Sequence, residues 1–272
     1  MKELTANEVL KKINFPVELQ DVFLADGRKI DNHKTVIRKD INKPLSIVTD
    51  RYNLLDNKRC FSVPLEVITS SKNNYLINRY SLNKEGETTV VDCLSKDDYK
   101  IPGNKKDEVY KKRVVFVNSY NRRSSLKMLF GAWRLICENG AGVFMESVEM
   151  FRIVHAGNRE PKIVKDMIMK SLLKYDVVFK QHLDVLSNLS NERVNEKELV
   201  SIFERMKFGK RVSKNISDIL STDYSLTLLG IYGAVTQYLR NREISAGIIY
   251  PSILADSLKI LNVLVKSKKI RR

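Results

Sequence analysis

Cysteine is scarce in this chain of 272 residues, and its scarcity excludes two kinds of protein. The three cysteines are Cys60, Cys93 and Cys137, which are too few and too scattered for a disulfide framework. No Cys-x-x-Cys pair and no cluster of cysteine with histidine offers the ligand spacing of a zinc site. We therefore expect reduced thiols, a cytoplasmic location, no metal and no cofactor.

Long hydrophobic runs are also missing. No apolar stretch approaches the roughly 20 residues that a membrane-spanning helix needs. The N-terminal segment MKELTANEVLKK lacks the apolar centre of a signal peptide. The sequence therefore predicts a soluble protein with no membrane partner.

Acidic residues are few relative to basic ones, and this imbalance bears on the partner. The chain has 48 Lys and Arg against 32 Asp and Glu, a formal net charge of +16 and a pI of about 9.6. Such an excess favours polyanionic partners, of which nucleic acid is the first. A solvated lysine-rich surface without a particular partner would give the same count, so the charge total leaves both readings open.

Hydrophobic periodicity separates a β-rich part from a helical part. Short β-branched segments at 21–30, 34–38 and 45–49, each expected to be one strand, indicate hairpins or a meander. A hairpin loop is expected at 83–87, where Gly86 can take a positive φ. The sequence predicts an α+β fold, with an N-terminal antiparallel β-rich part that includes one or two helices and a C-terminal helical part.

The helical part begins after Asn158, where apolar residues recur at three- and four-residue steps. The expected helices cover 164–189, a segment from Asn195 to a stop at Gly209, 224–240 and 251–265. We expect a core domain of residues 1–160 and a helical region of 161–272 that packs on it or extends from it, unless both form one continuous domain.

The stretch 113–158 gathers the chemically unusual residues. It contains the single tryptophan, Trp133, together with Cys137 and His155. Its pattern indicates strands joined by a polar turn at 119–125 and a glycine-containing turn. We expect Trp133 in the sheet core, because a tryptophan buries a large area.

The region around the polar turn is more basic than the chain as a whole. Ten Lys and Arg lie between Lys100 and Arg134, against Asp107 and Glu108. Cations that follow phosphates and aromatic rings that stack on bases are the two components of single-strand binding. Tyr120 is the expected stacking ring. The predicted contact residues are Lys105, Lys106, Lys111, Lys112, Arg113, Tyr120, Arg122, Arg123, Lys127, Arg134 and Arg152.

No catalytic residue is predicted, and we expect a protein that is not an enzyme. His155 has neither a nucleophile motif nor a paired carboxylate beside it in the sequence. A metal-independent enzyme that uses His155 with Arg152 and Arg134 remains a third alternative.

Several motifs carry a resemblance to a known family. They are Ser119 with Tyr120, the run RLICENG from Arg134 to Gly140, Arg152 with His155, and upstream Arg38, Arg51 and Tyr52. Over about residues 20–240 the chain resembles the phage- and plasmid-like family described as domain of unknown function 932. It departs from that family at the turn before the aromatic strand, where the family often has Asp-Gly and this chain has AsnArgArg.

The resemblance implies a role in mobile-element DNA metabolism or in conflict with host defence. The β-then-α layout is compatible with single-strand annealing proteins, by analogy of fold alone. Our first hypothesis is a non-enzymatic protein of phage or plasmid type that binds single-stranded DNA, as a recombination or annealing factor and as a homo-oligomer. The alternative is a phage-encoded interaction protein that inhibits or neutralises a host defence factor.

Overall fold

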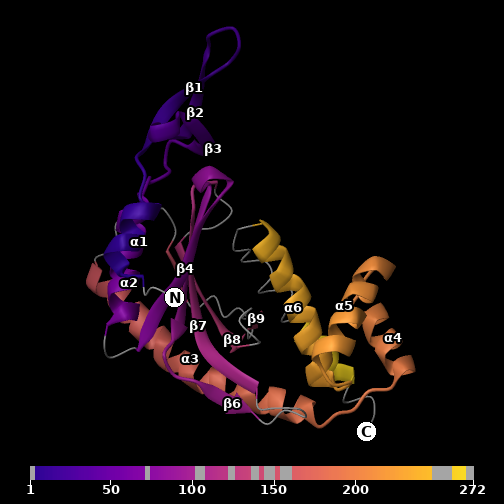
Figure 1. Ribbon diagram of the computed structural model, residues 1–272. Coiled ribbons are helices and arrows are strands. Elements are labelled where there is room, and N and C mark those ends of the chain that lie inside the picture. The colour runs from indigo at the N-terminus through magenta and orange to yellow at the C-terminus, as the bar shows by residue number, and fades with distance from the viewer. Residues whose placement is uncertain are drawn as a thin grey trace. The chain divides into compact units, whose positions relative to one another are not determined.

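The computed structural model divides the chain into two compact units (Figure 1). It describes residues 4–70, 74–101, 108–121, 126–135, 141–143, 151–153, 161–246 and 259–267. The first unit comprises Met1–Lys96, Val114–Leu129 and Glu149–Leu173, and the second Asp97–Arg113, Phe130–Val148 and Lys174–Arg272. Residue 160 does not separate the units, because strands β7 (Glu108–Ser119) and β8 (Leu126–Leu135) and helix α3 (Pro161–Ser190) contribute residues to both.

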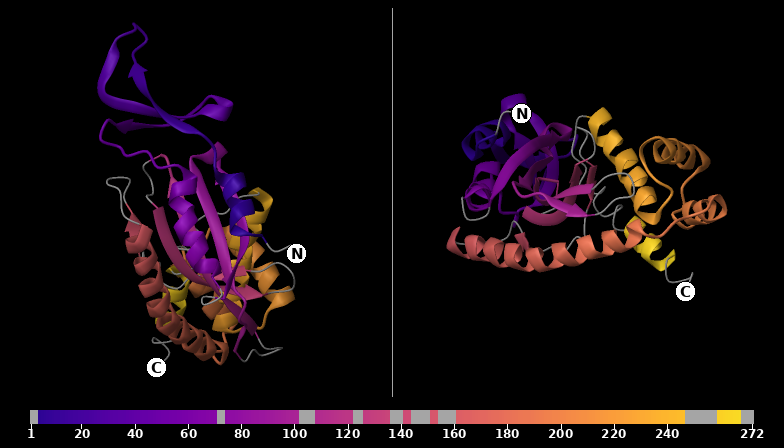
Figure 2. Two further views of the ribbon diagram at one scale, coloured as in Figure 1. Left: turned by 90° about the vertical axis from the view of Figure 1, so that its left-hand side faces the viewer. Right: turned by 60° about the horizontal axis from the view of Figure 1, so that its bottom comes forward.

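A three-stranded antiparallel sheet belongs to the first unit (Figure 2). Its strands are β1 (Val17–Phe23), β2 (Lys29–Arg38) and β3 (Lys43–Thr49), in that order. The single strand expected at 21–30 is wrong, since the chain reverses there. Gly27 takes a φ of +84°, and the Asp26 carboxylate accepts a hydrogen bond from the Arg28 N–H at 3.0 Å. An Asp-Gly pair favours such a turn over a continuous strand.

The larger sheet orders its strands β10-β8-β7-β5-β4, where β4 is Tyr75–Asn83, β5 is Thr88–Ser95 and β10 is Phe151–Ile153. The expected hairpin loop between β4 and β5 is confirmed. Gly86 has a φ of +104°, and a Cβ there would lie 2.5 Å from Cζ of Phe15, so only glycine fits without displacing the ring.

Two helices lie wholly within the first unit. Helix α1 (Ala6–Ile13) begins at a capping box in which Thr5 and Glu8 exchange hydrogen bonds, and α2 (Asn57–Thr69) is capped by the side chain of Asp56. The two helices pack against each other and against β4.

The second unit holds the C-terminal helices. Strand β6 (Tyr99–Ile101) pairs with the start of β7, and β9 (Ala141–Val143) pairs with the end of β8. Helices α4 (Glu196–Arg205), α5 (Lys210–Asp223) and α6 (Leu228–Ala246) follow α3, and residues 259–267 are also helical. The α+β fold, with antiparallel strands first and helices after them, is therefore confirmed. None of the described helices is long and apolar enough to cross a membrane.

Gly209 does not end the helix that starts at Asn195, as the sequence suggested. Helix α4 ends at Arg205, Lys207 takes a left-handed φ of +56°, and Gly209 is the N-cap of α5. Helix α5 was not predicted, because few of its residues are apolar and only Ile216 and Leu220 are buried.

Candidate nucleic-acid interface

The structure describes the side chains of five of the predicted contact residues. These are Lys111, Lys112, Arg113, Tyr120 and Lys127. Lys105, Lys106, Arg122 and Arg123 lie outside the described residues, as do Cys137 and His155. Arg134 and Arg152 lie on β8 and β10, and Trp133 lies on β8, but their side chains are outside the described part.

Tyr120 is buried, so its predicted role as a stacking ring is wrong. Its ring is 0% exposed and lies 5.8 Å from the ring of Phe15, in a cluster with Val36, Leu45 and Val48. Its N–H donates to the Glu87 carbonyl at 2.8 Å, and the Ser46 hydroxyl donates to its carbonyl. Burial, the largest of several causes, raises the pKa of Tyr120 well above its usual value. The ring is a core residue of the first unit.

Arg38 packs on the same phenylalanine. Its guanidinium carbon lies 4.1 Å from the Phe15 ring centroid, and Nε and Nη2 each donate to the Asp40 carboxylate at 2.8 Å. Nη1 donates to the Glu85 carbonyl, also at 2.8 Å. Two motifs of the family resemblance, far apart in the sequence, therefore meet at Phe15, and their role in this unit is structural.

The cations of β7 are buried or paired. Arg113 is 2% exposed, and its backbone N–H donates to the Tyr175 hydroxyl at 3.1 Å. Lys111 Nζ lies 2.7 Å from the Asp98 carboxylate. A base or phosphate cannot reach Arg113 in this conformation, so its prediction as a contact residue is wrong.

Lys112 is held in place from two sides. Its Nζ lies 2.6 Å from Oδ1 of Asp176 and 5.2 Å from the centroid of the Tyr99 ring. Burial disfavours the charged form, but hydrogen bonds to Asp176 and Tyr99 outweigh burial and raise the pKa of Lys112. A phosphate would have to displace Asp176 to use this charge.

Two predicted residues do come together in the first unit. Lys127 of β8 lies directly opposite Arg152 of β10 in the antiparallel register. Lys127 is half-buried. Both stay predicted phosphate contacts, although Lys127, like Lys111 and Lys112, already interacts with another group of the protein.

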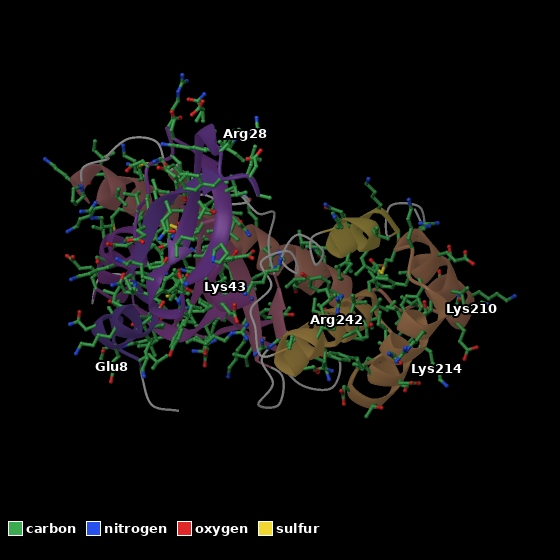
Figure 3. All side chains as sticks on the ribbon, turned by 90° about the horizontal axis from the view of Figure 1, so that it is seen from above. Glu8, Arg28, Lys43, Lys210, Lys214 and Arg242 are labelled. Atoms are coloured by element: carbon green, nitrogen blue, oxygen red, sulfur yellow. The ribbon has the colours of Figure 1, made fainter. Side chains whose placement is uncertain are left out.

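A different cluster of cations is open, on the corner between α4 and α5. Residues 205–217 contain five Lys and Arg and no Asp or Glu. The cations are Arg205, Lys207, Lys210, Arg211 and Lys214, called the α5 cationic segment below. All five are exposed. Figure 3 shows Lys210 and Lys214 extending from this helix.

Most of the α5 cationic segment makes no ion pair with the part of the chain that the structure describes. Arg205 donates a hydrogen bond of 3.4 Å to the Ser267 hydroxyl. The remaining four, Lys207, Lys210, Arg211 and Lys214, have no acidic partner within 4.0 Å among these residues. They differ in this respect from Lys111 and Lys112, whose charges are matched.

The start of α5 adds to this positive field. Its N-cap, Gly209, offers no side-chain acceptor to the N–H groups of the first turn, and no acidic residue lies in that turn. The helix dipole places partial positive charge at the same end, where Lys210 and Arg211 add to it. The like charges at the start of α5 repel one another, and a bound anion would offset this repulsion.

The sequence contained the signal for this cluster, the run KFGKRVSK at 207–214. If Gly209 ends a helix, as the sequence pattern suggests, the run lies in a connection and its cations share no helix end. As a helix start, the same run puts its cations around one end of a helix.

The described residues contain no group of three His, Cys, Asp or Glu side chains that could hold a metal ion. Cys60 and Cys93 are buried free thiols, and burial raises the pKa of Cys60 to about 12. Neither is therefore a reactive thiolate near neutral pH.

A family model described as Domain of unknown function (DUF932) matches residues 44–259. No curated protein and no solved structure matches the chain.

Proposed function

The chain belongs to this DUF932 family, whose description gives no activity, and we propose from the chain's own charges that it binds single-stranded nucleic acid without catalysing a reaction. The observation that carries the proposal is the α5 cationic segment. Four of its cations are exposed and unpaired among the described residues, beside an uncapped helix start. Each phosphate that such cations bind releases condensed counterions, which drives association.

The net charge of +16 supports the same proposal at long range. A positive field raises the encounter rate with any polyanion, and the open cations then hold the backbone. Single strands are proposed over duplexes because cations at the corner between two short helices can follow a flexible single-strand backbone.

The test compares two triple variants in the full-length protein. Lys210, Arg211 and Lys214 are changed to Ala in one, and Lys29, Lys39 and Lys43 in the other. The second set is exposed but paired, with Nζ–carboxylate distances of 3.1 Å to Asp21, 2.8 Å to Glu18 and 2.5 Å to Glu85. Both variants lose the same formal charge, so only the placement of the charge differs.

Affinity for a labelled single strand is measured against salt concentration. We expect the α5 variant to bind more weakly and to flatten the log–log salt slope by about 2, the value for three phosphate contacts on a single strand. The control variant should keep a slope close to that of the wild type. A flat salt response of the wild type, or equal losses in both variants, would contradict the proposal.

The wider setting is part of the proposal. We place the protein in the cytoplasm, which the buried free thiols Cys60 and Cys93 support, and in a phage- or plasmid-type recombination or annealing pathway as a homo-oligomer on single-stranded DNA. A strand-annealing assay with complementary oligonucleotides tests this role.

An acidic protein surface is the second candidate ligand for the same open cations, as in a phage-encoded inhibitor of a host defence factor. If an acidic protein is the ligand, the wild-type protein captures one host protein in stoichiometric amount, and the α5 variant does not. Neither protein then binds nucleic acid.

A further inference from the structure

A groove of about 650 Å³, lined mainly by residues with polar side chains, lies between α5 and α6, within the second unit. It is lined by Asn215, Asp218 and Ile219 from α5, and by Tyr238, Asn241, Arg242, Ser245 and Ala246 from α6. Its volume falls in the range of small-ligand sites, roughly 300–1,000 Å³. The α6 residues recur at steps of three and four, so they form one face of that helix.

The polar side chains of the groove are available to a ligand. Asn215, Asp218, Tyr238, Asn241, Arg242 and Ser245 make no side-chain hydrogen bond or ion pair with other described residues. Tyr238 is half-buried, and the other five are exposed. Polar groups gathered in a groove without mutual pairing keep their full capacity for a bound molecule.

The groove continues from the α5 cationic segment. Arg211 lies one turn before Asn215 on α5, and Lys214 lies one turn before Asp218. Figure 3 shows Lys214 on α5 and Arg242 on α6 within the same group of helices. A backbone held by the cations would therefore have its next nucleotide beside the groove.

The chemistry of the lining favours a base over a phosphate. The Asp218 carboxylate repels phosphate but accepts hydrogen bonds from the amino and imino groups of bases. The amides of Asn215 and Asn241 both donate and accept, which suits the edge of a base. Tyr238 offers a ring on which a base can stack, and Arg242 can neutralise a phosphate at the rim.

We propose that this groove receives one unpaired base of a bound single strand, stacked on Tyr238 and hydrogen-bonded by Asn241 and Asp218. The inference rests on the proposed function and adds that the site contacts a base of the bound strand as well as its phosphates. Because Watson–Crick edges are engaged in a duplex, the groove also makes the protein selective for single strands. Deoxyribose and ribose strands present the same base chemistry, so both are tested.

The experiment combines variants of Tyr238 with oligonucleotides that lack bases. Binding of the full-length protein is measured for single-stranded DNA, the same sequence in RNA, and a DNA strand of abasic sites with equal charge. Tyr238→Leu should weaken binding of the base-containing strands between about fivefold and a hundredfold, the range for loss of one stacked base. Tyr238→Phe keeps the ring and should bind within about threefold of wild type.

Two further results discriminate the groove from the cations. Tyr238→Leu should leave both the salt slope and the affinity for the abasic strand unchanged, because these depend on phosphates. Asn241→Ala should weaken the base-containing strands only, and its side chain is exposed, so it does not disturb the core. Circular dichroism and a urea transition show whether each variant is folded.

The outcomes separate the two proposals. Steep salt dependence with equal affinity for abasic and normal strands, unaffected by Tyr238→Leu and Asn241→Ala, overturns the groove inference and leaves the proposed function standing. No binding of any strand overturns both. Saturable binding of free mononucleotides that strands do not compete for would also overturn the inference, in favour of a small-molecule site.

Discussion

Phe15 shows how one side chain can fix several others in the first unit. Its side chain is 4% exposed. The Arg38 guanidinium carbon lies 4.1 Å, and the centroid of the Tyr120 ring 5.8 Å, from the centroid of the Phe15 ring. The Phe15 ring also touches the backbone at Gly86, where any Cβ would collide with it. Arg38 and Tyr120, two of the residues that carried the family resemblance, thus share a physical task here, the assembly of one aromatic centre. Such centres depend on shape complementarity in three dimensions.

A buried histidine makes the stability of the second unit depend on acid. His182 is 2% exposed in α3, and burial lowers its pKa to about 3, from an ordinary value of 6.5. The unfolded chain binds a proton at this site below about pH 6.5, whereas the folded chain does so only near pH 3. The stability that His182 contributes is therefore fully present above pH 6.5 and is lost as the pH falls towards 3.

We expect the contribution of His182 to the folding equilibrium constant to fall by up to about tenfold per pH unit within this window. Urea unfolding between pH 7 and pH 4 measures it, with His182→Leu as the comparison because leucine fills a similar space and does not titrate. The variant should lose part of the wild-type pH dependence. Parallel pH profiles for the two proteins would show that His182 does not contribute.

At the scale of elements, strongly periodic or well-capped segments could be predicted from the sequence. The long helix α3, the capping box at the start of α4 and the β4–β5 hairpin all carry local signals that residues nearby in the chain decide. Helix α5 was missed because a Gly that caps a helix start resembles one that ends a helix. The packing of α5 against α6 determines that this segment is a helix, and this contact cannot be predicted from the residues near Gly209 in the sequence.

Prediction of the binding site from the sequence was limited for the same reason, because contacts between distant residues cannot be seen there. The sequence identified a stretch that is more cationic than the chain as a whole, but it could not show that Asp98 and Asp176 lie beside Lys111 and Lys112. Asp98 lies in the connection between β5 and β6, and Asp176 lies in α3. Tyr120 was assigned to the surface because its neighbours are polar, yet Phe15, from a distant segment, covers it. Which charges stay free depends on tertiary contacts.

The start of α5 offers a test in which stability and binding move in opposite directions. Gly209 has extended φ and ψ of −70° and 158°, which an N-cap aspartate adopts readily, and a Cβ there would meet nothing within 4 Å. Gly209→Asp should stabilise the protein by about 0.5–1 kcal/mol, because its carboxylate accepts from the first-turn N–H groups and complements the dipole.

The same carboxylate would occupy the place of a phosphate, so Gly209→Asp should weaken single-strand binding while the urea midpoint rises. Gly209→Asn caps the helix without a charge and is the matched control, with a smaller loss of affinity expected. If Gly209→Asp gained stability and lost no affinity, the start of α5 would not be a phosphate contact.

At the scale of the whole molecule, the excess of cations has opposite consequences for the free protein and for its complex. A net charge of +16 destabilises the compact state by self-repulsion, which salt screens. A bound strand relieves this repulsion and stabilises the folded state by mass action, with about 2.7 kcal/mol at a ligand concentration of one hundred times Kd. Salt weakens that binding steeply.

Thermal unfolding should therefore respond to salt with opposite signs in the two states. Raising NaCl from about 50 mM to about 200 mM is expected to raise the Tm of the free protein, and to lower the Tm measured with excess single strand, since four phosphate contacts on a single strand cost about fiftyfold in affinity over this range. The Lys210, Arg211 and Lys214 triple variant should keep the first response and lose much of the second. If salt shifted both Tm values in the same direction, the strand would not stabilise the folded protein through its charges. The excess positive charge would then serve solubility alone.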